Sequence, residues 1–199
     1  PQAGADALRY YLLREIPTAG DGDWSEEKFK VRYNADLANG LGNFTARILT
    51  LARKAEILRP SATSFIKGGK NLPLEKGVPQ SGEGFIETEI QAMRSAVAKA
   101  VADRKLHEAL ATIWKLISFG DQYISANKPW ELLRRLNGRS PDPVAQASGE
   151  AVVKNCLIIL EAVATELEPF LPTTSEAILA NLSAEPLAKV GTAPLFPRI

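Results

Sequence analysis

The sequence predicts an all-α protein, a helical bundle of about five or six helices. Apolar residues recur every three or four positions in most segments, as they do on the buried face of a helix. Glycine and proline cluster between these segments, and no segment shows the apolar–polar alternation of a half-buried strand. Of the 199 residues, 45% are hydrophobic, which is enough to fill a core. We therefore expect one α-helical domain over residues 1–199.

The first two helices are predicted at residues 5–15 and 26–59. Pro17 ends the first, because a proline disfavours helical backbone at the residue before it. Ser25 has the side chain of an N-cap, and the two glutamates after it suit the positive end of a helix. The apolar residues of the second helix are spaced by 4, 4, 3, 4 and 3 positions: Tyr33, Leu37, Leu41, Phe44, Ile48 and Leu51.

Residues 60–84 are rich in glycine and proline and are predicted to form a loop. Two helices follow it almost without interruption, and Pro129 ends the second of them. Their predicted buried residues are Ile86, Ile90, Met93, Val97 and Val101, then Leu106, Leu110, Ile113, Ile117 and Ile124. Two more helices are predicted at residues 144–167 and 172–182.

The single cysteine and the single histidine exclude two kinds of site. Cys156 has no partner for an internal disulfide, and its apolar surroundings in sequence predict a buried, inert thiol. With His107 alone, no zinc site can be built from cysteine and histidine. No signal peptide and no apolar run of about 20 residues is present, so we expect a cytoplasmic protein without a membrane partner.

The net charge of +1 argues against a protein that coats nucleic acid, but the charges are segregated along the chain. Residues 44–80 carry +5 and residues 128–139 carry +3, whereas residues 15–27 carry −5 and residues 150–176 carry −4. Such segregation is typical of a surface that meets a polyanion. On charge alone, an ordinary solvated surface is the simpler interpretation.

Three polar or aromatic residues stand out from the helical pattern. Asn43 and Arg47 are four residues apart on one helix, so they share a face beside the apolar stripe. An amide and a guanidinium can address a base edge, although a local hydrogen bond or a helix-cap interaction is the commoner explanation for such a pair. Trp130 follows Pro129 at a helix break, where its ring could stack on an unpaired base. The general tendency of tryptophan to be buried favours a core position instead.

Five segments of the sequence resemble bacterial methionyl-tRNA synthetases, in the order in which that family has them. They are residues 4–14, 34–47, 127–130, 167–172 and 195–199. The first segment is shared among several class I synthetases. The Pro-Trp step combined with Asn-x-x-x-Arg is more specific for the methionine enzyme. The resemblance therefore points to the C-terminal, anticodon-binding part of that family.

The resemblance implies a helical domain that recognises the CAU anticodon of methionine tRNA through Asn43, Arg47 and Trp130. The basic residues near them are then expected to contact the tRNA backbone: Lys54, Lys128, Arg134 and Arg135. The catalytic signatures of the family are absent, and the chain begins with Pro1. We therefore expect a piece of a methionine–tRNA ligase that is not an enzyme by itself. ATP and zinc would belong to the catalytic domain, a partner within the same parent chain.

Two alternatives remain open from the sequence. One is the corresponding domain of another class I synthetase, such as the leucine, valine or cysteine enzyme. The other is a helical scaffold for protein interaction, in which the basic segments meet an acidic partner. The anticodon hypothesis requires Asn43, Arg47 and Trp130 to meet on one exposed surface, and a Trp130 sealed in the core would contradict it.

Overall fold

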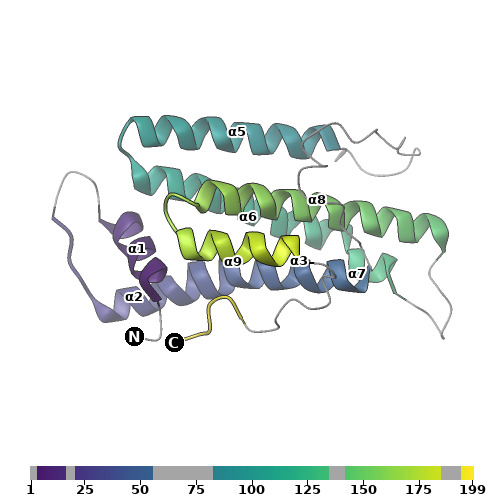
Figure 1. Ribbon diagram of the computed structural model, residues 1–199, viewed down its shortest axis with the longest axis horizontal. Helices are drawn as coiled ribbons and strands as arrows, with labels where there is room; N and C mark the ends of the chain where they lie inside the picture. The colour runs from purple at the N-terminus through teal and green to yellow at the C-terminus, as the bar shows by residue number, and fades with distance from the viewer. Residues whose placement is uncertain (1–3, 17–20, 56–82, 135–141, 185–193) are drawn as a thin grey trace.

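The computed structural model describes residues 4–16, 21–55, 83–134, 142–184 and 194–199, and helices are the only regular secondary structure in them. The fold class predicted from the sequence is confirmed. The elements, shown in Figure 1, are α1 (Gly4–Glu15), α2 (Glu26–Arg32), the π-helix η1 (Tyr33–Gly42), α3 (Asn43–Lys54), α5 (Glu83–Ala102), α6 (Leu106–Asn127), α7 (Pro129–Leu132), α8 (Pro143–Leu167) and α9 (Pro172–Ser183).

The elements α2, η1 and α3 form one continuous helix, as predicted from the apolar spacing. The six residues of its predicted stripe are all at most 7% exposed. The sequence predicted α-helical winding throughout, which is wrong for the ten residues of η1. A π-helix bonds each N–H to the carbonyl five residues back, so each turn takes more than four residues, and apolar residues four positions apart still share one face. The predicted end at Arg59 lies outside the described residues.

The other helices begin and end close to their predicted positions. Ser25 caps α2 by accepting a hydrogen bond from the Lys28 N–H, and Asp142 caps α8 by accepting from Val144 and Ala145. The predicted buried face of α5 is correct except at Val101, whose side chain is 43% exposed. Ala100 is buried in its place, because the α-helical period turns Val101 away from the core near the helix end.

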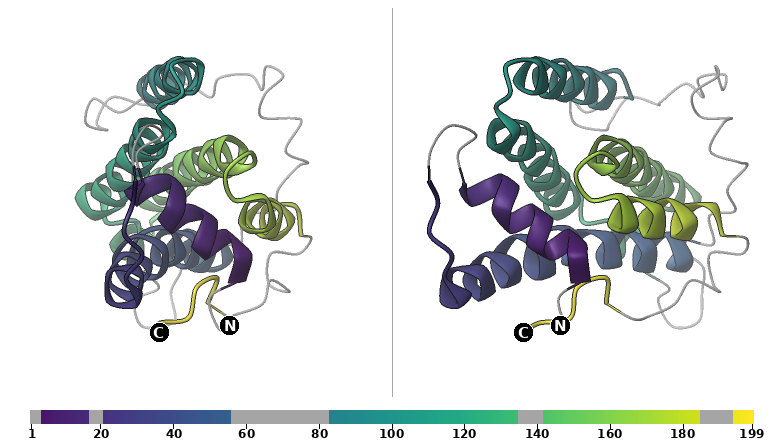
Figure 2. Two further views of the ribbon diagram at one scale, coloured as in Figure 1. Left: turned by 90° about the vertical axis from the view of Figure 1, so that its left-hand side faces the viewer. Right: turned by 60° about the vertical axis from the view of Figure 1, so that its left-hand side comes forward.

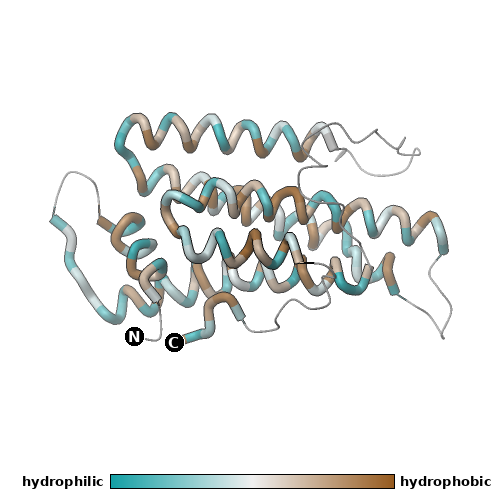
Figure 3. The backbone as a smooth tube through the Cα atoms, in the orientation of Figure 1, coloured by the Kyte–Doolittle hydropathy of each residue, from teal (hydrophilic) through white to brown (hydrophobic). Residues whose placement is uncertain are grey.

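Helices α5, α6, α8 and α9 and the long helix run roughly along the length of the molecule, whereas α1 lies across one end (Figures 1 and 2). One continuous set of buried apolar residues joins them. Figure 3 shows that apolar residues, in brown, recur at short intervals along each helix. Gly120 of α6 lets the ring of Phe44 on α3 approach closely. Among the described residues, no helix has both the length and the apolar character needed to cross a bilayer.

Residues 194–199 pack back on the π-helix. The Tyr33 hydroxyl donates a hydrogen bond to the Pro197 carbonyl at 2.9 Å. The Asn34 side chain donates to the Ile199 carbonyl at 2.8 Å and accepts from the Ile199 N–H at 3.2 Å. Phe196 is 8% exposed and meets the Tyr33 ring edge-on. Residues 194–199 therefore cover one side of η1 near its first residues, and η1 runs on directly into α3.

Candidate functional site

Trp130 lies at the surface, on a short helix that is held in place by its neighbours. Lys128 ends α6 in a left-handed conformation with φ of 43°, and α7 begins at the next residue. Pro129 is buried, whereas the Trp130 side chain is 41% exposed. The core position that burial tendency favoured for this tryptophan is therefore wrong. The indole presents part of its surface to solvent.

Packing between α7 and α8 fixes the position of this indole. Leu133, just after α7, lies over Gly149 of α8, where a Cβ atom would come within 2.9 Å of the Leu133 Cγ. The absent side chain at Gly149 therefore lets the segment that carries Trp130 sit directly against α8. The sequence alone showed no reason for a glycine at this position in a long helix.

Arg47 and Trp130 line the same open depression, although they are far apart in the sequence. The depression has a volume of about 310 Å³ and is completed by Ala46, Thr50 and Leu51 of α3. Among the described residues that line it, Arg47 alone is charged, and the other lining residues include aliphatic side chains and the indole of Trp130. A flat aromatic group that also carries hydrogen-bond acceptors would match such a surface.

An ion pair with α6 holds the Arg47 side chain. Its Nη1 donates to the Asp121 Oδ1 at 2.5 Å, and the side chains are 33% and 30% exposed. Burial raises the pKa of Asp121 above its ordinary value, although the Arg47 charge opposes this rise. Asp121 was not predicted as part of the site. The sequence did contain an indication of this role. Asp121 lies four residues after Ile117, so its carboxylate falls on the apolar stripe of α6.

Cys156 of α8 lies inside the core, close enough to the Arg47–Asp121 ion pair for both charges to influence the pKa of its thiol. It is fully buried, and burial raises the pKa of its thiol to about 12. The thiol is therefore protonated at neutral pH and has no access to solvent, which agrees with the inert role predicted from the sequence.

Asn43 is exposed and lies one helical turn before Arg47, at the junction of η1 and α3. It does not line the depression, so the structure brings Arg47 and Trp130 together directly and places Asn43 beside them along the helix.

Three of the four basic residues predicted near the site are described. Lys54 is exposed in the last turn of α3, and Arg134 is exposed just after α7. Lys128 is exposed and pairs with Glu131, with 3.6 Å between the Nζ and Oε1 atoms. Arg135 lies outside the described residues. The described cations thus flank the depression on both of the elements that form it.

Comparison with known proteins identifies relatives along nearly the whole chain. The family model described as tRNA synthetases class I (M) matches residues 2–49. The chain is 31% identical to the methionine–tRNA ligase of Brucella suis biovar 1 (strain 1330), over 98% of the chain and 37% of that protein. It is 36% identical to the methionine–tRNA ligase of Clostridium perfringens (strain 13 / Type A), over 92% of the chain and 25% of that protein.

Solved structures show the same fold. Mycobacterium tuberculosis methionyl-tRNA synthetase in complex with methionyl-adenylate matches with a TM-score of 0.76 and 24% identity, over 98% of the chain and 38% of that chain. The free form of that synthetase matches with a TM-score of 0.75 over 100% of the chain and 39% of that chain. The chain thus spans between a quarter and two-fifths of these relatives' length. With this identity to the ligases over nearly all its residues, the chain belongs to the methionyl-tRNA synthetase family.

Proposed function

We propose that the surface formed by Asn43, Arg47 and Trp130 binds the CAU anticodon of methionine tRNA. The observation that supports this most directly is that Arg47 and Trp130, from distant parts of the sequence, line one open depression. Membership of the methionyl-tRNA synthetase family makes tRNA the natural ligand for such a surface. In this proposal, the intact protein acts in the cytoplasm and joins methionine to that tRNA using ATP.

Each residue has a chemical role in the proposal. The exposed indole of Trp130 offers a face on which an unstacked base can lie. The guanidinium of Arg47 has five N–H donors, and the bond to Asp121 uses one nitrogen. The remaining donors can bond a base edge, and the exposed amide of Asn43 adds both a donor and an acceptor. The depression, at about 310 Å³, is at the small end of ligand pockets, which suits a single base.

The charge balance of the site favours selective contacts over general attraction. Asp121 largely neutralises Arg47, so this arginine contributes directed hydrogen bonds more than net charge. Lys54 and Arg134 are exposed near the depression and supply charge for the phosphate groups. Activation of methionine, with its ATP and zinc, belongs in our proposal to a catalytic domain outside this chain.

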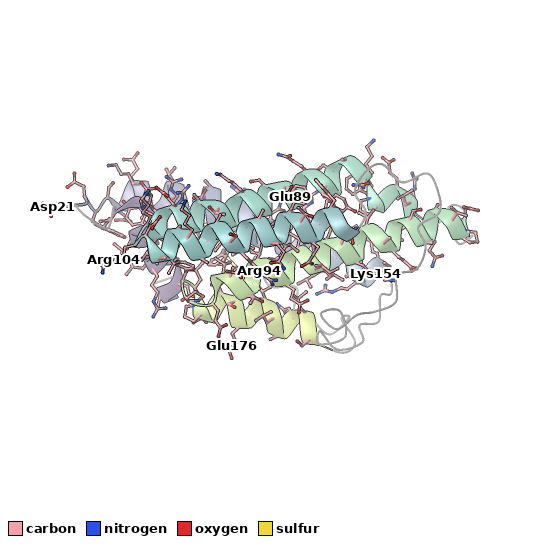
Figure 4. All side chains as sticks on the ribbon, turned by 90° about the horizontal axis from the view of Figure 1, so that it is seen from above. Asp21, Glu89, Arg94, Arg104, Lys154 and Glu176 are labelled. Carbon is pink, nitrogen blue, oxygen red and sulfur yellow. The ribbon has the colours of Figure 1, made fainter. Side chains whose placement is uncertain are left out.

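The decisive experiment measures the affinity of the 199-residue chain for methionine tRNA and for the same tRNA with its first anticodon base changed. We expect weaker binding of the changed tRNA at moderate salt. Trp130→Ala should cost about 1–3 kcal/mol of binding if the ring stacks on a base. Lys154→Gln is the matched control, because Lys154 is exposed on the face formed by α5, α8 and α9 (Figure 4).

Four results would contradict the proposal. Equal affinity for the two tRNAs would remove the claim of anticodon recognition. A Trp130→Ala variant that unfolds earlier without selective loss of binding would assign the indole a packing role. A preference for leucine, valine or cysteine tRNA would point to another class I synthetase. Binding to acidic proteins in the absence of any tRNA binding would support the helical scaffold considered above.

A further inference from the structure

Residues 194–199 place an exposed arginine beside the part of the long helix that bears Asn43, and the proposed function gives this arginine no role. The Nη2 atom of Arg198 donates a hydrogen bond to the Asn39 Oδ1 at 2.7 Å. Asn39 lies four residues before Asn43, and both asparagines and the arginine are exposed. We propose that Arg198 is a specificity-determining residue that recognises the third base of the bound anticodon, a uracil. The proposal rests on the proposed function, since it takes the first base to lie in the depression at Trp130.

Contacts on both sides of Arg198 hold its backbone against η1. The C-terminal segment, in yellow, runs beside the long helix (Figures 1 and 2). The Tyr33 hydroxyl donates to the Pro197 carbonyl at 2.9 Å. The Asn34 side chain both donates to and accepts from the backbone of Ile199. Because the residues before and after the arginine are both bonded to η1, less conformational entropy is lost when its guanidinium binds a ligand.

The guanidinium of Arg198 has donors to spare. The bond to Asn39 uses one of the five N–H donors of a guanidinium. Within the part of the chain that the structure describes, Arg198 makes no ion pair and no other hydrogen bond. Arg47 differs in this respect, because Asp121 balances its charge. Arg198 therefore presents solvent-accessible donors from a side chain that Asn39 holds at one edge.

The groups that would contact bases lie in order along the long helix. Asn39, Asn43 and Arg47 are spaced by four residues, and residues at this spacing share a face in both η1 and α3. From Arg47 to Asn39 the helix rises by at most about 12 Å, at the α-helical rise of about 1.5 Å per residue. Bases of one strand are about 3.4 Å apart when stacked and farther apart when splayed out, so three unstacked bases can span this distance. A first base at Trp130 therefore puts the third base within reach of Arg198.

The chemistry of an arginine suits uracil better than cytosine at this position. A guanidinium carries donors and no acceptor. Uracil presents the O4 atom as an acceptor, whereas cytosine carries an amino group there, which is a donor. A cytosine in the third position would therefore set its amino group against the N–H groups of Arg198. The proposal thus predicts that Arg198 favours a CAU anticodon over a CAC anticodon.

The first test measures the affinity of the 199-residue chain for methionine tRNA with a CAU or a CAC anticodon. We expect the wild-type chain to prefer CAU by about fivefold or more, the discrimination typical of one well-placed arginine–base contact. Arg198→Gln should abolish this preference and leave discrimination at the first base unchanged. Arg198→Lys keeps the charge but lacks the planar fork of donors, so it should retain the salt dependence of binding and still lose the preference. Lys154→Gln, on the face of α5, α8 and α9 (Figure 4), should leave every ratio unchanged.

The second test removes the group that holds the arginine. Asn39→Ala deletes the acceptor for Arg198 and should weaken the preference for CAU over CAC without changing discrimination at the first base. Because Asn39 and Arg198 are both exposed, the urea midpoint of either variant should match that of the wild-type chain. This measurement separates a change in recognition from a loss of fold.

Three outcomes would overturn the proposal. In the first, the wild-type chain binds CAU and CAC equally. In the second, the Arg198→Gln chain keeps the preference for CAU. In the third, Arg198→Gln weakens binding of both anticodons by the same factor, which would reduce Arg198 to a general charge. If the wild-type chain ignores the first base but shows a preference at the third base that depends on Arg198, the assignment of the first base to Trp130 fails and the role of Arg198 stands.

Discussion

The Arg47 guanidinium and the Asp121 carboxylate meet at 2.5 Å between α3 and α6, at the edge of the depression that contains Trp130. Each side chain is about one-third exposed, so the ion pair lies at the boundary between the protein interior and the surface. Asp121 accepts a hydrogen bond from the Nη1 atom of Arg47 and does not bond the other two nitrogens of the guanidinium. The carboxylate thus acts as a positioning residue for Arg47 in the proposed recognition of RNA.

Asp121→Ala should reduce discrimination between the CAU and changed anticodons about tenfold, which corresponds to about 1.4 kcal/mol. Arg47 would lose its anchor and gain net charge, so it would bind phosphates without selection. Asp121→Asn keeps an acceptor for Arg47 and should retain most of the discrimination. The measurement is the ratio of dissociation constants for the two tRNAs. Equal ratios in the alanine and asparagine variants would contradict a positioning role.

Gly149→Ala should weaken tRNA binding by displacing Trp130. The added methyl group would lie 2.9 Å from the Leu133 Cγ, so Leu133 and the helix that precedes it must move away from α8. Combining it with Leu133→Ala removes the two closest atoms and should restore part of the affinity. Trp130 fluorescence, in a chain whose other tryptophans are replaced by phenylalanine, should report the displacement. An affinity unaffected by Gly149→Ala would show that Trp130 does not depend on this contact.

Gly120→Ala should lower the free energy of unfolding by about 1–3 kcal/mol, because the new methyl group would overlap the Phe44 ring inside the core. Gly84→Ala is the matched control. It lies in an exposed turn of α5 with nothing within 4 Å of an added Cβ, so it should stabilise the chain by up to about 1 kcal/mol. Urea unfolding monitored by circular dichroism measures both. Equal effects of the two substitutions would contradict the close packing of α6 on α3.

The Cys156 thiol should stabilise the native state in a pH-dependent way. Burial raises its pKa from 9.0 to about 12, so the native chain holds the proton where the unfolded chain releases it. Stability relative to Cys156→Ala should therefore be constant below pH 9 and fall as pH rises from about 9 to about 12. Urea unfolding of both chains at a series of pH values measures this difference. A difference independent of pH would show that the thiol reaches solvent in the native chain.

The sequence predicted the helices well because each has an apolar stripe set by local spacing. The stripe of Tyr33, Leu37 and Leu41 did not reveal π-helical winding, since the spacing fits either helix. Some of the groups that pack against the two glycines of η1 come from distant residues. Trp114 lies 3.4 Å from the position of a Cβ on Gly40, and Phe196 lies 3.8 Å from one on Gly42. Such contacts cannot be read from a local pattern.

The candidate site was predictable only in part, for a similar reason. The exposure of Trp130 depends on how Leu133 packs on Gly149, which the sequence around Trp130 does not encode. Asp121 could have been noticed as a carboxylate on an apolar stripe that requires a partner. The roles of Asn43, Arg47 and Trp130 toward RNA remain predictions that the binding experiments above address.

The contact between Asn34 and Ile199 also bears on how the chain folds during its synthesis. The two residues are 165 positions apart, and Asp6 receives hydrogen bonds from Thr174 at a separation of 168. A ribosome therefore releases α1 and the π-helix long before it makes the residues that satisfy their buried polar groups. Until then, the Tyr33 ring has no Phe196 to meet. The contacts that residues 174–199 make with these early helices can therefore form only after that later segment has been synthesised.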